Sequence, residues 1–152
     1  MDIPRRAVGY RLETVEVEDE TVVTGAILQS GSSDVSWKAP SGGFISSIEN
    51  MAQFCNGVLN HPSVTDDMRG VLWEPQPLLD GTMSDGYGLG FSLRIHNGRN
   101  LMWHNGAQQK TETNMNIYPD DDMCFVVMTN SEWASSGALV EALEDAYRST
   151  LP

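Results

Sequence analysis

Six consecutive apolar residues, MCFVVM at 123–128, constrain the fold of this chain more than any other feature. A strand with one face in water alternates apolar and polar residues, whereas an unbroken apolar strand is covered on both faces. We therefore predict a central β-strand at 123–128, with another element packed against each of its faces.

The residues before this run alternate with the period of β-strands, and two turn signals separate them. Asn97-Gly98 tolerates the positive φ angles of a tight hairpin turn, so the strands on either side of it should pair antiparallel. The third strand has a polar face, formed by Glu112, Asn114 and Asn116. Expected strands lie at 89–95, 101–104, 111–118 and 123–128, with turns at 97–98 and 119–122.

Helical periodicity occurs on both sides of the predicted sheet. The capping pattern Ser46-x-x-Glu49 precedes apolar residues at three- and four-residue spacing, which predicts a helix over 47–59. A shorter helix is expected over 65–72. A last helix, capped near Ser135 or Ser136, should pack through a stripe formed by Leu139, Val140, Leu143, Ala146 and Tyr147.

This order of elements predicts an α+β fold in a single domain, residues 1–152. An antiparallel meander of about four strands is covered by the C-terminal helix and preceded by a helical segment. The expected division is an irregular or extended lead-in at 1–43, the helical segment at 44–85, the sheet at 86–130 and the closing helix at 131–152.

The charge of the chain narrows its expected partners. Nine basic and 21 acidic residues give a net charge of −12, which repels phosphate backbones and anionic membrane surfaces. We therefore expect neither nucleic acid nor a membrane as a partner. The N-terminus lacks the apolar core of a signal peptide, so the chain as given is expected to be cytoplasmic.

Cysteine and histidine spacing predicts no metal and no cofactor. Cys55 and Cys124 lie far apart in apolar contexts, which favours buried free thiols. The histidines His61, His96 and His104 and the acidic turn 120–122 show no metal-ligand spacing.

Three segments carry a resemblance to a known family. They are APSGGFISSIENMAQFCNGVLN, YGLGFSL and HNGAQQKTETNMNIYPDDDMCFVVMTNSE. In this order and spacing they resemble the C-terminal half of the serine β-lactamase-like hydrolases, a group that includes class C β-lactamases, esterases, D-aminopeptidases and penicillin-binding proteins. The likeness runs from Arg6 to Tyr147, so it implies part of a β-lactamase/transpeptidase-like fold. Because that family is often periplasmic or secreted, the resemblance leaves the location open.

The resemblance implies a role for His104, Asn105 and Gly106. They stand where the family has a Lys-Thr-Gly or His-x-Gly strand that walls the pocket, and the backbone N–H of Ala107 would then be an oxyanion donor. The family often has a glycine and an aromatic residue where this chain has Lys110-Thr111, so the mouth of the pocket should differ.

The nucleophile and base of that family are missing from this sequence. In the family a Ser-x-x-Lys supplies both, and a Tyr-x-Asn or Ser-x-Asn supplies a second proton-transfer group. Neither Lys38 nor Lys110 follows a serine by three residues, and no Tyr-x-Asn or Ser-x-Asn occurs. Ser46 and Ser47 are expected to cap a helix rather than attack a substrate. We therefore expect a truncated C-terminal portion that is inert alone.

Two classes of function stay open. The first is a hydrolase-related domain, either inert or completed by an N-terminal partner that carries Ser-x-x-Lys. The second is a non-catalytic module that binds a small molecule or a protein. The resemblance also implies that strand 123–128 normally pairs with N-terminal strands. Its exposed edge is expected to pair with a second copy, as a homodimer, or with residues 14–24 of its own chain.

Overall fold

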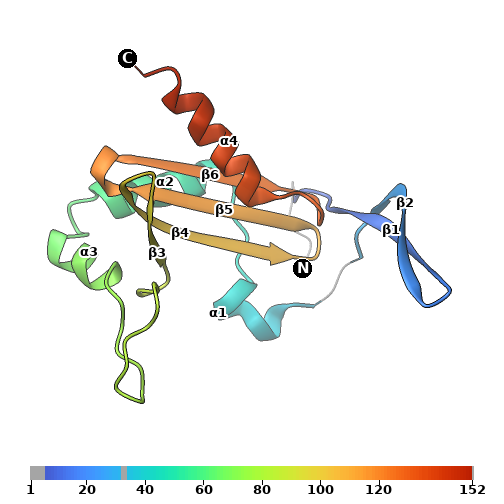
Figure 1. Ribbon diagram of the computed structural model, residues 1–152, viewed down its shortest axis with the longest axis horizontal. Helices are drawn as coiled ribbons and strands as arrows, with labels where there is room; N and C mark the ends of the chain where they lie inside the picture. The colour runs from blue at the N-terminus through green and yellow to red at the C-terminus, as the bar shows by residue number, and fades with distance from the viewer. Residues whose placement is uncertain (1–5, 32–33, 152) are drawn as a thin grey trace.

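The computed structural model describes residues 6–31 and 34–151 and has an α+β architecture, as predicted. A two-stranded sheet pairs β1 with β2, and a four-stranded antiparallel sheet has the order β3-β4-β5-β6 (Figure 1). The elements are β1 (Tyr10–Val17), β2 (Glu20–Gln29), η1 (Ser36–Lys38), α1 (Ala39–Gly42), α2 (Ile48–Asn60), α3 (Asp66–Leu72), β3 (Ser92–His96), β4 (Arg99–Gln108), β5 (Thr111–Tyr118), η2 (Pro119–Asp121), β6 (Met123–Thr129) and α4 (Ser136–Arg148).

The predicted meander is confirmed, with two adjustments to its strands. Asn97 and Gly98 have φ angles of 50° and 76°, so they make the expected turn between β3 and β4. β3 begins at Ser92 rather than at residue 89, because Gly90 has a φ of 80°, which interrupts the extended backbone. β4 runs on to Gln108, four residues farther than predicted.

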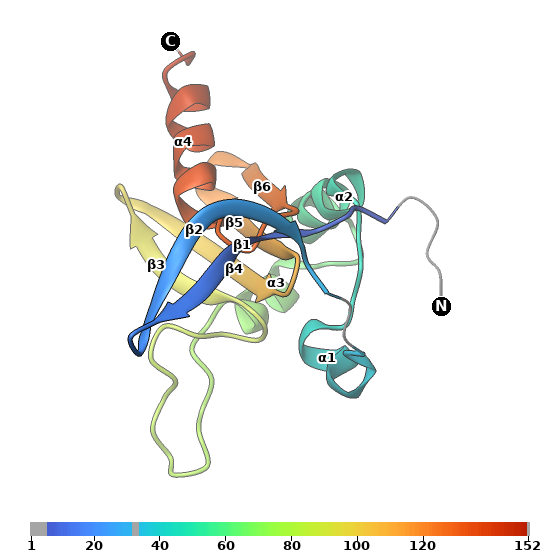
Figure 2. The same cartoon turned by 90° about the vertical axis from the view of Figure 1, so that its right-hand side faces the viewer.

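Helices cover the two faces of the sheet, α2 on one and α4 on the other (Figure 2). Each face has its own core. On the α2 side the buried residues are Cys55, Val58, Phe91, Met115 and Ile117. On the α4 side they are Leu101, Tyr118, Phe125 and Val140. Alternate residues of β6 enter both cores, so its continuous apolar sequence is explained by two covered faces.

The prediction that strand 123–128 is central in the sheet is wrong for the described residues, where β6 is the last strand in the sheet order. Hydrophobic periodicity reports which faces are buried, and it carries no information about lateral neighbours. Residues 14–24 do not cover this edge either, because they lie in β1 and β2 and pair with each other. Tyr10 instead bridges Ser131, just beyond the end of β6.

The prediction of free thiols is also wrong, because Cys55 and Cys124 form a disulfide. Their Cα atoms are 6.2 Å apart, although 69 residues separate them in sequence. The packing of α2 against β6 brings them together, and sequence spacing alone could not reveal this packing. The bond ties the helix to the edge strand.

The N-terminal half differs from its predictions in two places. Ser47 caps α2, since its Oγ accepts a 3.3 Å hydrogen bond from the N–H of Asn50, so Ser46 is not the cap. Residues 36–42, expected to be irregular, form the single turn η1 and the short helix α1. The helix predicted at 65–72 is confirmed as α3, with Thr65 as its cap.

The apolar stripe predicted for α4 is largely wrong, because only Val140 of its five residues is buried, whereas Leu139, Leu143, Ala146 and Tyr147 are exposed. Glu144 is 3% exposed, and its carboxylate accepts hydrogen bonds from Asn116 Nδ2 at 2.6 Å and Tyr118 Oη at 2.7 Å. We call these three residues the polar seam. Because the polar face of β5 needs partners, Glu144 takes the buried position while Leu143 and Tyr147 are left 44% and 46% exposed.

Reduction of the Cys55–Cys124 disulfide should destabilise the fold. A disulfide that closes a loop of 69 residues stabilises the folded state by about 4 kcal/mol, because it lowers the conformational entropy of the unfolded chain. Urea unfolding with and without a reducing agent measures the difference. A variant with both cysteines replaced by alanine should not respond to the reducing agent. An equal response in the two proteins would contradict the bond.

Replacement of Glu144 by alanine should cost about 3 kcal/mol of unfolding free energy, because two buried donors lose their acceptor. Glu141→Ala is the matched control on the same helix. Its half-exposed carboxylate lies 3.9 Å from Arg94, so we expect a cost below about 0.5 kcal/mol. Similar unfolding midpoints for the two variants would argue against a stabilising role for the polar seam.

Candidate functional site

The C-terminal part of β4 forms the candidate site, because it has a neighbouring strand on one side only. β3 begins only at Ser92, opposite Trp103, whereas β5 continues beside β4 to Gln108. Across the described chain, residues 104–108 thus pair with β5 alone, and their other side is open. All four predicted wall residues are exposed in this stretch: His104, Asn105, Gly106 and Ala107.

The backbone of Ala107 points to the open side of β4. Ala107 lies opposite Glu112. The N–H of Glu112 donates to Thr129 Oγ1 at 3.2 Å, and its carbonyl accepts from the same hydroxyl at 3.1 Å, so both groups face β6. Opposed residues of an antiparallel ladder exchange either both hydrogen bonds or neither. The N–H of Ala107 therefore faces away from β5, where it can donate to the oxygen of a bound carbonyl.

Gly106 keeps the face of β4 beside Ala107 flat. It lies opposite Thr113, and a Cβ added to it would lie 3.1 Å from Thr113 Oγ1. That separation is shorter than an ordinary van der Waals contact, so any larger residue would displace the threonine side chain. Glycine at this position lets a ligand approach the strand closely.

Tyr87, which the sequence analysis did not single out, contacts His104. Its Oη lies 2.9 Å from His104 Nε2, and the two rings meet edge to face with centroids 6.1 Å apart. His104 Nδ1 lies 2.7 Å from the carbonyl oxygen of Asn105. Because a carbonyl can only accept, Nδ1 donates to it, and in that tautomer Nε2 accepts from the hydroxyl of Tyr87.

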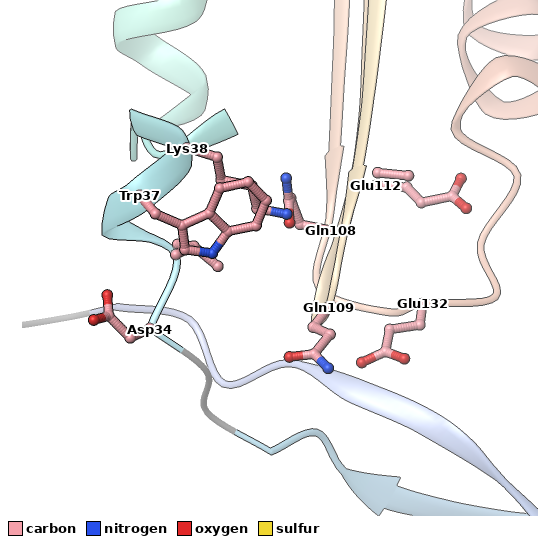
Figure 3. A pocket seen from close by; sticks show the side chains of 9 residues that line it. Asp34, Trp37, Lys38, Gln108, Gln109, Glu112 and Glu132 are labelled. Atoms are coloured by element: carbon pink, nitrogen blue, oxygen red, sulfur yellow. The ribbon is translucent and has the colours of Figure 1, made fainter. Parts of the chain in front are cut away.

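A pocket of about 610 Å³ opens at the end of β4, next to Ala107 (Figure 3). Trp37 and Lys38 of η1 stand across from Gln108, and Lys38 Nζ lies 5.5 Å from the centroid of the Trp37 ring. The full lining is Asp34, Val35, Trp37, Lys38, Ala107, Gln108, Gln109, Glu112 and Glu132. The pocket can therefore offer a ligand an aromatic face and charged and amide groups, and Ala107 is part of its wall.

The two serines at the start of α2 are engaged in local contacts. Ser47 caps the helix, and Ser46 Oγ donates to the carbonyl of Ser47 at 3.3 Å. Among the described residues, no three histidine, cysteine, aspartate or glutamate side chains lie close enough to hold a metal ion. The helices in the same residues are all too short or too polar to cross a bilayer.

A family model described as Beta-lactamase matches residues 2–146 of the chain. The matched range contains Tyr87, His104 and Ala107 and ends within α4. A comparison with curated proteins found no match.

Proposed function

Because this chain belongs to the Beta-lactamase family, we propose that residues 104–107 form one wall of a pocket for an acyl group. The outward N–H of Ala107 supports this role most directly. In acyl-transfer sites a preorganised backbone N–H stabilises the oxyanion of the tetrahedral intermediate. The pocket beside Ala107 gives an acyl ligand room to approach that donor.

These 152 residues are proposed not to perform serine acyl transfer alone. The sequence holds no Ser-x-x-Lys, and loss of the nucleophile from such a site lowers the rate by about 10⁶-fold. The nucleophile and base would come from outside these residues, either from a longer protein or from a second chain. Without them, the same pocket would act as a binding module for a small molecule.

Labelling tests the absence of serine chemistry. Treatment of the chain with a fluorescent penicillin, followed by peptide mapping, should give no serine adduct. A class C β-lactamase under the same conditions serves as the positive control. Stoichiometric modification of Ser46, Ser47 or any other serine would overturn the proposal that the chain is inert alone.

Titration with unlabelled benzylpenicillin tests the pocket wall in the same chain. In ¹H–¹⁵N spectra we expect the amide signals of Ala107 and Gln108 to move as the probe is added at millimolar concentration. The amide of Val15, in the β1–β2 hairpin, is the control and should stay in place. An unmoved Ala107 signal at saturating probe would contradict the role of this strand in acyl binding.

The open edge of β6 is proposed to pair with a further strand. Glu112 and Thr129 point their backbone N–H and C=O groups toward each other. The alternate residues of β6 therefore point their backbone N–H and C=O groups away from β5, and these residues are Cys124, Val126 and Met128. Farther along the same side, Tyr10 already donates to the carbonyl of Asn130 at 2.9 Å and accepts from the N–H of Glu132 at 2.9 Å. Within residues 6–31 and 34–151, the edge is thus partly occupied at one end and has no strand beside it from 124 to 128.

A second copy of the chain is one candidate for this strand, and an N-terminal partner that carries Ser-x-x-Lys is the other. Exposed Leu143 and Tyr147 of α4 favour an additional apolar neighbour here, because the Tyr147 ring contacts Phe125 of β6 at 5.8 Å between centroids. Two copies would each bring a charge of −12, so their association should strengthen as salt screens the repulsion.

Light scattering at micromolar concentration tests the homodimer, which should have twice the 16.7 kDa mass of the chain. Met128→Pro should abolish the dimer, because proline removes an outward N–H while the pairing with β5 is kept. Met128→Ala keeps that N–H and should still dimerise. A wild-type chain that stays monomeric at low and high salt would exclude the second copy.

A further inference from the structure

Tyr87, His104 and the carbonyl of Asn105 form a continuous hydrogen-bonded series at the candidate site. A nucleophile, a base within hydrogen-bond reach and a third group that orients the base are the recurring parts of an activated nucleophile. Here the phenol lies 2.9 Å from Nε2, and the carbonyl lies 2.7 Å from Nδ1. We propose that Tyr87 is a nucleophile activated by His104 and reactive toward acyl donors.

The backbone on both sides of this pair is fixed. His104 and Asn105 lie in β4, where they pair with Met115 and Asn114 of β5. Tyr87 makes an antiparallel bridge with Ser92, and its carbonyl accepts a hydrogen bond from the hydroxyl of Ser84. Because neither partner lies at the tip of a free loop, the Oη–Nε2 contact costs little further ordering.

Exposure alone would not single out Tyr87 among the tyrosines. Tyr87 is 40% exposed, close to 37% for Tyr10 and 46% for Tyr147, whereas Tyr118 is 1% exposed. All of these tyrosines lie in the described part of the chain, and there only Tyr87 contacts a histidine nitrogen. Tyr10 and Tyr147 therefore report the reactivity of an exposed phenol without a neighbouring base.

The reaction with an aryl acetate needs no group beyond this pair. Tyr87 Oη forms a bond to the carbonyl carbon, and its proton moves to His104 Nε2. The bond from that carbon to the aryl oxygen then breaks, and the departing phenolate takes the proton from Nε2. The products are O-acetyl-Tyr87 and a free phenol, with His104 returned to its neutral form.

Acetylation by p-nitrophenyl acetate, quantified for each tyrosine by peptide mass spectrometry, tests the inference. We expect Tyr87 to react about 10-fold or more faster than Tyr10 and Tyr147, because a positioned base accelerates proton transfer by this order or more. His104→Gln keeps a hydrogen-bond acceptor without a base, so Tyr87 should fall to the rate of Tyr10. His96→Gln, which removes a histidine that contacts Asn97 instead, is the matched control and should leave the rate unchanged.

Two outcomes would overturn the inference: equal rates at Tyr87, Tyr10 and Tyr147 in the wild type, or an undiminished Tyr87 rate in His104→Gln. Reaction at buried Tyr118 marks unfolding of a variant, and the wild-type comparison stands without any variant. The acetylation test of Tyr87 and the penicillin tests of the proposed function can fail independently of each other. A serine adduct would contradict inertness and leave Tyr87 unaffected, whereas an unreactive Tyr87 would leave the pocket proposal intact.

Discussion

The burial of β6 between α2 and α4 is the constraint on which the rest of the structure depends. Phe125 packs toward α4, and Cys124 is joined to α2 by the disulfide, so both helices are positioned by one strand. The position of β6 sets the register in which β5 pairs with it, and β5 in turn sets the register of β4. The direction of the Ala107 N–H is thus determined two strands away, at the pair formed by Glu112 and Thr129.

The sequence was sufficient for the sheet and the longer helices because hydrophobic period reports burial of faces. The four strands of the meander were predicted on this basis, the Asn97-Gly98 turn and the cap of α4 were predicted from their residue types, and all of these are confirmed. Lateral position and contacts between distant elements leave no such pattern. The edge location of β6, the disulfide and the buried Glu144 were therefore missed.

Some residues of the candidate site could likewise be predicted from the sequence, and others could not. The order of three segments located residues 104–107, since a motif is visible in a single sequence. Tyr87 lies 17 residues before His104, within a motif that suggested only a strand, so their contact depends on how the chain between them folds. The sequence could propose Ala107 as an oxyanion donor, but the direction of its N–H could be assigned only from the pairing of β4 with β5.

The polar seam has a consequence for the orientation of α4. A helix packed by interchangeable aliphatic side chains can rotate or slide with little penalty, because one methyl group replaces another. A carboxylate with two donors cannot, since any shift leaves Glu144, Asn116 and Tyr118 unsatisfied in a region of low dielectric constant. The hydrogen bonds of the polar seam therefore fix the rotation of α4 about its own axis. In that rotation Leu139 and Leu143 face outward. The same hydrogen bonds that fix the packing of α4 therefore leave apolar side chains on the surface.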